Sequence, residues 1–113
     1  MQPFNSNGNQ RQNQRFQTNI PIQLIIGTQL TVQGQLRDLS LKSAFIQIKE
    51  SIYIQLNDEL SFIIGRSMEN LDDCVQGQAR ISRISAGEGI AIYFTKMDED
   101  SVERLKILVD AYR

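Results

Sequence analysis

The sequence predicts a small antiparallel β-barrel or sandwich that ends in one helix. Six short strand-like segments follow one another at near-regular spacing, with no helical pattern between them. Only the carboxyl-terminal segment has the three-to-four-residue apolar spacing of a helix. The chain has 113 residues, which is enough for one domain with a single core and too few for two.

The first three strands are expected at residues 20–26, 30–40 and 43–48. β-branched residues dominate the first range, and Pro21 lies at its start, where a strand tolerates proline. Apolar and polar residues alternate in the second range, as they do in a half-buried strand. Gly34 interrupts that alternation, so we expect a β-bulge there.

The other three strands are expected at 60–64, 74–84 and 90–94, with a turn over 85–89. In a regular strand Arg80 and Arg83 would lie on opposite faces, so at most one of them would face a given site. A closed barrel is the natural arrangement of such strands, because closure removes exposed edges.

A helix is expected at residues 98–112 and should cover one mouth of the barrel. Asp98 or Asp100 is the expected N-cap, and further acids near this end suit the helix dipole. The apolar stripe that would face the barrel consists of Val102, Leu105, Leu108, Val109 and Tyr112.

The composition excludes several kinds of site. Without histidine, no Ser-His-Asp or Cys-His mechanism and no His-ligated metal can be built, so an enzyme is the least favoured class. Cys74 alone cannot form an internal disulfide or a cysteine-cluster metal site. We expect no metal and no cofactor. No run approaches the ~20 apolar residues of a membrane helix, and no signal peptide is evident. The expected location is cytoplasmic.

The basic residues are concentrated at the front of the chain. Residues 1–37 carry a net charge of +3, whereas the remaining nine basic and thirteen acidic residues give −4. Half of the first eighteen residues are Asn or Gln. Residues 1–18 therefore cannot bury enough apolar surface to fold alone, and we expect a flexible arm ahead of a domain spanning 19–113. The open alternatives are a solubilising tail and an arm that presents its arginines to an anion.

Two fragments could form a binding site. The first is Arg11-Gln12-Asn13-Gln14-Arg15, an Arg-x-x-x-Arg pair on the arm, and the second is Asp38-Leu39-Ser40-Leu41-Lys42-Ser43 between the second and third strands. Taken separately, each has an ordinary explanation. Two arginines in a polar tail are usually solvated, and Asp and Ser in a strand connection usually bond their own backbone.

Together and in this order, the two fragments resemble the PilZ family of cyclic di-GMP receptors. The family pattern is Arg-x-x-x-Arg on an arm, one hairpin, Asp/Asn-x-Ser-x-x-Gly, the rest of a six-stranded barrel and a carboxyl-terminal helix. The resemblance extends from about Gln10 to Tyr112. The chain departs from the pattern at the last motif position, where Ser43 replaces glycine.

The resemblance implies a receptor that binds cyclic di-GMP with Arg11, Arg15, Asp38, Ser40 and Ser43. Gln10, Arg37 and Lys42 are further candidate contacts. Guanidinium groups suit phosphate oxygens and guanine, a carboxylate can accept from guanine N–H groups, and a serine hydroxyl can donate to a phosphate. The arm would close over the ligand, and the ordered arm would present a new surface to an unidentified effector protein.

Two other functions remain open at this point. One is a PilZ-fold interaction adaptor that no longer binds the nucleotide, for which Ser43 is the main support. The other is a single-stranded nucleic-acid binder, which 7% aromatic residues and an acidic barrel disfavour. We expect neither a nucleic-acid polymer nor a membrane as partner, and a monomer or weak dimer.

Overall fold

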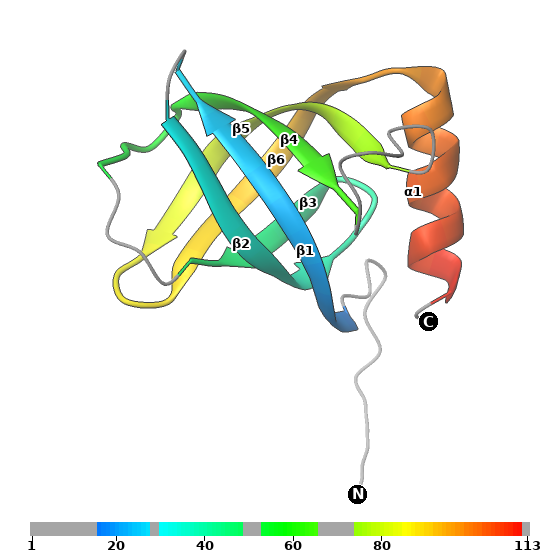
Figure 1. Ribbon diagram of the computed structural model, residues 1–113, viewed down its shortest axis with the longest axis horizontal. Helices are drawn as coiled ribbons and strands as arrows, with labels where there is room; N and C mark the ends of the chain where they lie inside the picture. The colour runs from blue at the N-terminus through cyan, green and yellow to red at the C-terminus, as the bar shows by residue number, and fades with distance from the viewer. Residues whose placement is uncertain (1–15, 28–29, 49–52, 66–73, 112–113) are drawn as a thin grey trace, which may run out of the picture.

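Six antiparallel strands close into a barrel in the computed structural model, which describes residues 16–27, 30–48, 53–65 and 74–111, with side chains from residue 20 onward (Figure 1). The strands are β1 (Phe16–Ile26), β2 (Leu30–Leu39), β3 (Ser43–Gln47), β4 (Glu59–Ile64), β5 (Val75–Ser85) and β6 (Gly89–Met97). Their order around the barrel is β1-β2-β3-β6-β5-β4, and β4 pairs with β1 to close it. The predicted closed barrel is confirmed.

The first strand begins earlier than the sequence analysis expects. β1 starts at Phe16, because its ladder with β2 continues through a register shift to the pairs Gln17–Asp38 and Phe16–Leu39. Residues 16–18 therefore lie in the strand and not in the arm to which we assigned them. This extension brings the first residues of β1 beside the last residues of β2.

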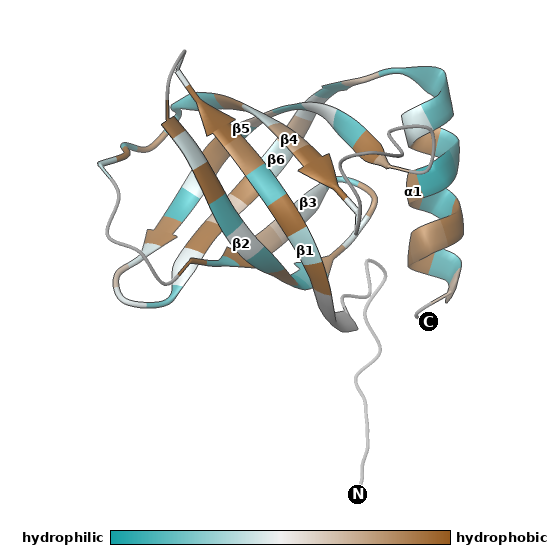
Figure 2. Cartoon of the chain, viewed as in Figure 1, coloured by the Kyte–Doolittle hydropathy of each residue, from teal (hydrophilic) through white to brown (hydrophobic). Residues whose placement is uncertain are grey.

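The core is formed by side chains that alternate inward along the strands. Figure 2 shows this alternation as hydrophobic and hydrophilic bands along β2. The largest fully buried side chains on β1 to β3 are Ile22, Leu24, Val32, Leu36, Leu39 and Ile46, and those on β4 to β6 are Phe62, Ile64, Ile81, Ile90 and Ile92. Because the interior is filled, the barrel offers only its ends and outer surface to ligands.

Gly34 does not form the expected bulge. It pairs in register with Ile22, and the bulge of β2 lies between Leu36 and Asp38 instead. A Cβ atom on Gly34 would lie 2.6 Å from the Ile46 side chain and 3.0 Å from the Gln47 carbonyl oxygen. Glycine at this position therefore allows a close approach between β2 and β3.

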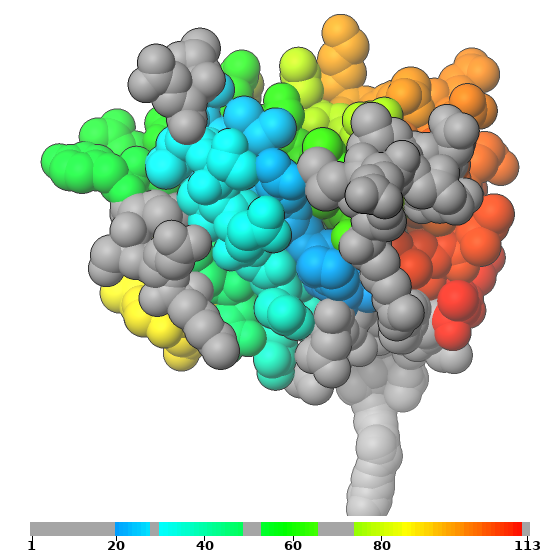
Figure 3. Space-filling model, in the orientation of Figure 1, coloured from blue at the N-terminus to red at the C-terminus, as the bar shows by residue number. Residues whose placement is uncertain are grey.

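The helix α1 (Glu99–Ala111) stands at one end of the barrel and packs against β5 (Figures 1 and 3). Leu105 and Val109 belong to the same buried cluster as the barrel side chains, whereas Val102 and Leu108 are only partly buried. Tyr112, the last residue of the predicted stripe, lies outside the described residues. Within the described ranges no helix is long and apolar enough to cross a membrane.

Asp98 caps the helix, as the sequence predicts. Its carboxylate accepts the Ser101 backbone N–H at 2.7 Å, and its carbonyl oxygen accepts the Val102 N–H at 3.0 Å. The backbone and side-chain hydrogen bonds from Ser101 lower the pKa of Asp98 below its ordinary value. The buried Ser101 hydroxyl also accepts the Gln76 N–H at 3.1 Å, which ties the start of α1 to β5.

Candidate functional site

The predicted Asp-x-Ser motif forms the connection between β2 and β3. β2 ends at Leu39 and β3 begins at Ser43, so only three residues make the turn. The turn also contacts β6, because the Lys42 carbonyl oxygen accepts the Phe94 N–H at 2.9 Å. The turn is therefore anchored both by the β2–β3 strand pair that it connects and by its hydrogen bond to β6.

Ser40 is the centre of this turn. Its backbone N–H donates to the Ser43 carbonyl oxygen at 2.9 Å, and its hydroxyl oxygen accepts the N–H groups of Lys42 at 3.2 Å and Ser43 at 3.1 Å. The hydroxyl also lies 3.2 Å from both the Ser43 carbonyl oxygen and the Ser43 hydroxyl. Ser40 is only 8% exposed. In this conformation its side chain bonds the local backbone, as serine does in many turns.

Asp38 has a different environment from Ser40. It precedes the turn on β2, pairs with Phe45 of β3 and is half-buried. The bulge beside it places Arg37 and Asp38 both outside the barrel, between the inward side chains of Leu36 and Leu39. No hydrogen bond or ion pair to the described residues engages its carboxylate. The motif therefore presents, at a strand end, an acid whose carboxylate no other described residue pairs with.

Arg37 and Lys42 are the described residues among the three further candidate contacts. The Arg37 guanidinium donates to the Gln47 side-chain oxygen at 3.0 Å, so it bonds an amide of β3 and not an acid. Lys42 is exposed at the tip of the turn. Both cations flank Asp38 and Ser40 in sequence, but only Lys42 lies in the turn, because the Arg37 guanidinium bonds Gln47 at the far end of β3.

Next to Asp38, the outer face of the barrel carries an aromatic–cation pair. The Arg83 guanidinium carbon of β5 lies 5.5 Å from the centre of the Phe45 ring on β3. The strand between them, β6, contributes the small side chain of Ala91, which is the partner of both Phe45 and Arg83. The long arginine side chain can thus cross β6 to reach the ring.

Arg80 and Arg83 share this outer face, and our expectation of opposite faces is wrong. A register shift between Ile81 and Arg83 inserts Ser82 as an extra residue into β5. Arg80 is then the partner of Tyr93 and Arg83 the partner of Ala91, and these two partners point the same way along β6. The Ser82 hydroxyl donates to the Ala91 carbonyl oxygen at 3.2 Å at the bulge.

The two arginines nevertheless differ in their partners. Arg80 forms an ion pair with Glu59 at 3.0 Å, directed toward β4 and away from the motif. Arg83 is exposed and makes its ring contact on the side of the motif. Tyr93, the partner of Arg80 on β6, is 51% exposed and is also paired with Ser43 at the end of the turn.

The remaining predicted site residues, Gln10, Arg11 and Arg15, lie outside the described residues. Their roles stay predictions. What the structure does place is the strand that follows them, because Phe16 pairs with Leu39 just before Ser40. The motif turn and the first described residue of β1 therefore lie side by side.

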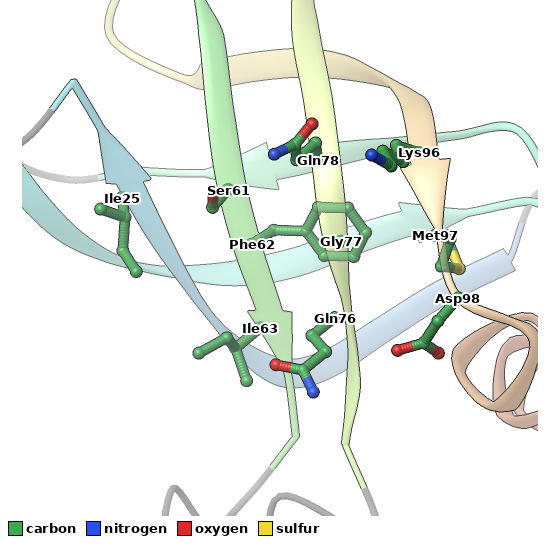
Figure 4. A pocket seen from close by; sticks show the side chains of 10 residues that line it. All are labelled: Ile25, Ser61, Phe62, Ile63, Gln76, Gly77, Gln78, Lys96, Met97 and Asp98. Carbon is green, nitrogen blue, oxygen red and sulfur yellow. The ribbon is translucent and has the colours of Figure 1, made fainter.

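A separate hollow of about 370 Å³ lies on another side of the barrel (Figure 4). It is shallow and lies over β4, β5 and the end of β6, where Ile63, Gln76 and Lys96 line it. Asp98, its one acid, already caps α1. None of the described site residues lines this hollow, so it lies apart from the candidate site.

Sequence reasoning identified the turn but missed Phe45, Arg83 and Tyr93 as its neighbours. Their position depends on pairing across β3, β6 and β5, which the linear order does not show. One signal was available: the apolar residues Ala79, Ile81 and Ile84 change from a spacing of two to a spacing of three. That change is typical of a bulge and would have placed both arginines on one face.

Comparison with known proteins agrees with the fold and the motif order. A family model described as PilZ domain matches residues 9–111. This range includes both predicted fragments, the whole barrel and the helix. No curated protein sequence matches the chain.

Three solved structures have a similar fold. The PilZ domain of CeSA from a cellulose-synthesizing bacterium is 21% identical, with a TM-score of 0.65 over 87% of this chain and 96% of that one. The Bacillus subtilis inhibitor of motility MotI/DgrA is 15% identical, with a TM-score of 0.69 over 91% of this chain and 51% of that one. The PilZ domain of Escherichia coli YcgR, solved with c-di-GMP, is 14% identical, with a TM-score of 0.67 over 92% of each chain.

Proposed function

Because the chain belongs to the PilZ domain family, we propose that it is a cyclic di-GMP receptor whose site lies between the Arg11–Arg15 pair and the β2–β3 turn. The observation that carries the proposal is the Asp38 carboxylate, unpaired among the described residues and held outward beside a turn whose hydrogen bonds centre on Ser40. The structural neighbour from Escherichia coli, solved with c-di-GMP, supports this choice of ligand.

The proposed contacts follow from the chemistry of the ligand, which carries two guanines and two phosphates. Asp38 accepts hydrogen bonds from the N–H groups on a guanine edge, as acidic side chains accept from base amines. Arg11 and Arg15 bind phosphate or the guanine carbonyl edge through their planar, forked donors. Ser40 holds the turn, and the half-buried Ser43 hydroxyl is the one better placed to reach the ligand.

Serine at position 43 is compatible with this site. The family glycine is thought to permit a special backbone angle or a close ligand approach. Among the described non-glycine residues only Asn57 has a positive φ, so Ser43 lies in ordinary strand conformation. The backbone conformation at Ser43 therefore gives no reason to expect that serine abolishes binding. If the chain does not bind cyclic di-GMP, the alternative is a PilZ-fold interaction adaptor without a ligand.

The signal is proposed to come from the amino-terminal segment. Phe16 is the neighbour of Leu39, so Arg15 is covalently one residue away from the strand pair that ends at the turn. A ligand bound by both regions would order residues 1–15, whose amide-rich composition disfavours independent folding. The ordered segment would then offer a new surface to an effector protein. The receptor would act in the cytoplasm as a monomer or weak dimer, with no catalytic step.

Titration calorimetry with cyclic di-GMP tests the proposal and gives the stoichiometry. We expect saturable heat, and we expect Arg15→Ala and Asp38→Ala each to weaken binding about tenfold or more. Glu88→Ala, an exposed acid in the β5–β6 turn, is the matched control and should bind like the unmodified chain. No heat at tens of micromolar ligand would reject the receptor, and unchanged affinity in both site variants would reject the site.

A further inference from the structure

The outer face of β3, β6 and β5 continues the surface that begins at Asp38. We propose that Arg83 and Tyr93 on this face form a stacking platform for a guanine base, so that the binding site extends beyond the two sequence motifs. This inference rests on the proposed function and adds residues that contact the ligand ring. It concerns the planar face of the base, whereas Asp38 would bind the edge.

The platform begins directly beside the motif. Phe45 is the partner of Asp38 across β2 and β3, and residues in this relation have Cβ atoms about 4.5–5.5 Å apart. A base whose edge reaches the Asp38 carboxylate would therefore project its ring over the neighbouring strand. Phe45 is half-buried there, and its ring is already covered by the Arg83 guanidinium at 5.5 Å.

Arg83 is the group that such a ring would meet. Its guanidinium is planar, its central carbon lies 5.5 Å from the centre of the Phe45 ring, and the side chain is exposed. Guanidinium planes stack on aromatic rings as well as binding phosphate. Two features fix its direction: the bulge at Ser82 turns Arg83 to this face, and Ala91 leaves room for the side chain to cross β6.

Tyr93 lies at the edge of the proposed stacking surface that is nearest the β2–β3 turn. It is the partner of Ser43, and its ring is 51% exposed. Half-exposed aromatic rings next to a nucleotide-binding motif suit base stacking, which every base permits because each has a π-face. Asp38, Arg83 and Tyr93 thus surround the Phe45 and Ser43 positions on one continuous surface.

Arg80 provides an internal contrast on the same strand. It shares the outer face with Arg83 and carries the same charge, but its guanidinium is bound to Glu59 at 3.0 Å. Removing either arginine changes the net charge of the face equally. Only Arg83 contributes a guanidinium directed toward the motif, so the two variants separate a specific contact from general electrostatics.

Calorimetry with cyclic di-GMP on four variants tests the platform. We expect Arg83→Gln and Tyr93→Leu each to weaken binding about tenfold, which is typical for the loss of a base-stacking partner. Arg83→Lys should also weaken binding, because an ammonium keeps the charge but cannot stack as a plane. Tyr93→Phe keeps the ring and should bind like the unmodified chain.

Arg80→Gln is the matched control and should change affinity less than twofold. Equal affinities for Arg83→Gln and Arg80→Gln would overturn the role of Arg83, as would full affinity in Arg83→Lys. Full affinity in Tyr93→Leu would overturn the role of Tyr93. If the unmodified chain binds and these variants match it, the platform fails while the receptor stands. If the unmodified chain gives no heat, both proposals fail.

Discussion

Two Asp–Ser pairs in this chain have opposite arrangements. Ser40 and Ser101 are the polar side chains that the described part of the structure buries, and each follows an aspartate by two or three positions. At the start of α1, Asp98 is engaged by the backbone N–H of Ser101. At the β2–β3 turn, Ser40 holds the backbone and Asp38 has no partner among the described residues.

This contrast separates a structural acid, Asp98, from the proposed binding acid, Asp38. A carboxylate that satisfies helix N–H groups contributes to folding and has little left to offer a ligand. A carboxylate held outward by a strand, beside a turn that is completed without it, is available for recognition. The same two residue types therefore predict different experimental phenotypes in the two regions.

The largest difference should appear when the two aspartates are replaced by alanine. Asp38→Ala should weaken cyclic di-GMP binding by about 2 kcal/mol, or about thirtyfold, because a charged acceptor is lost from the guanine edge. Its free energy of unfolding should stay within about 0.5 kcal/mol of the unmodified chain, as for other surface substitutions. Asp98→Ala should show the reverse pattern, with lower stability and unchanged affinity. Calorimetry and thermal melts of both variants check this, and parallel behaviour would remove the distinction.

Ser101→Ala should cause the next largest effect, this time on stability. The substitution leaves the Gln76 N–H of β5 without its buried acceptor, which costs about 1–3 kcal/mol. Denaturant unfolding measures the loss. Ser82→Ala is the control, since Ser82 is an exposed residue whose hydroxyl makes one part-buried hydrogen bond, and it should change stability by less than about 0.5 kcal/mol. Equal effects in both variants would contradict the proposed link between α1 and the barrel.

Ser40→Ala should destabilise the chain somewhat less, by about 1 kcal/mol, as when the capping side chain of a turn or helix is lost. The Ser40 backbone hydrogen bond to Ser43 remains, so the turn is weakened and not abolished. We also expect weaker ligand binding through displacement of Asp38 and Ser43. A variant with unchanged melting temperature would show that the hydroxyl contacts do not hold the turn.

The smallest predicted effect is the pH dependence contributed by Asp98. Hydrogen bonds from Ser101 lower its folded-state pKa below the ordinary value of 3.8. Its contribution to stability is therefore complete above that value and is lost as the pH falls through the lower folded-state pKa. Thermal melts of the unmodified chain and Asp98→Asn should differ at neutral pH and converge in strong acid. A difference that persists at the lowest pH would contradict this assignment.

Much of the fold could be predicted because local patterns determine it. β-branched runs and apolar–polar alternation located all six strands, and the acids before Val102 located the start of the helix. The bulges could not be placed in the same way. Glycine is common at bulges, but Gly34 instead allows close packing against Ile46. The bulges at Leu36–Asp38 and at Ser82 depend on how β2 pairs with β3 and how β5 pairs with β6.

The candidate site was predictable only where it is continuous in sequence. Asp38, Ser40 and Ser43 are near neighbours, so one motif reveals them. Phe45 lies just beyond the motif, but Tyr93 and Arg83 reach it from strands that are adjacent only because the order is β2-β3-β6-β5. The roles of Arg11 and Arg15 stay predictions, since they lie outside the described residues.

The most direct test of the account is a nuclear magnetic resonance titration of isotope-labelled protein with cyclic di-GMP. The account predicts that backbone amide shifts change at Asp38, Ser43, Phe45 and Tyr93, while the amides of Ser101 and its neighbours at the start of α1 stay constant. Such a map compares the two Asp–Ser pairs in one experiment. Shifts concentrated at the start of α1 and the hollow beside it, or no shifts at saturating ligand, would contradict the assignment of Asp38 as the binding acid.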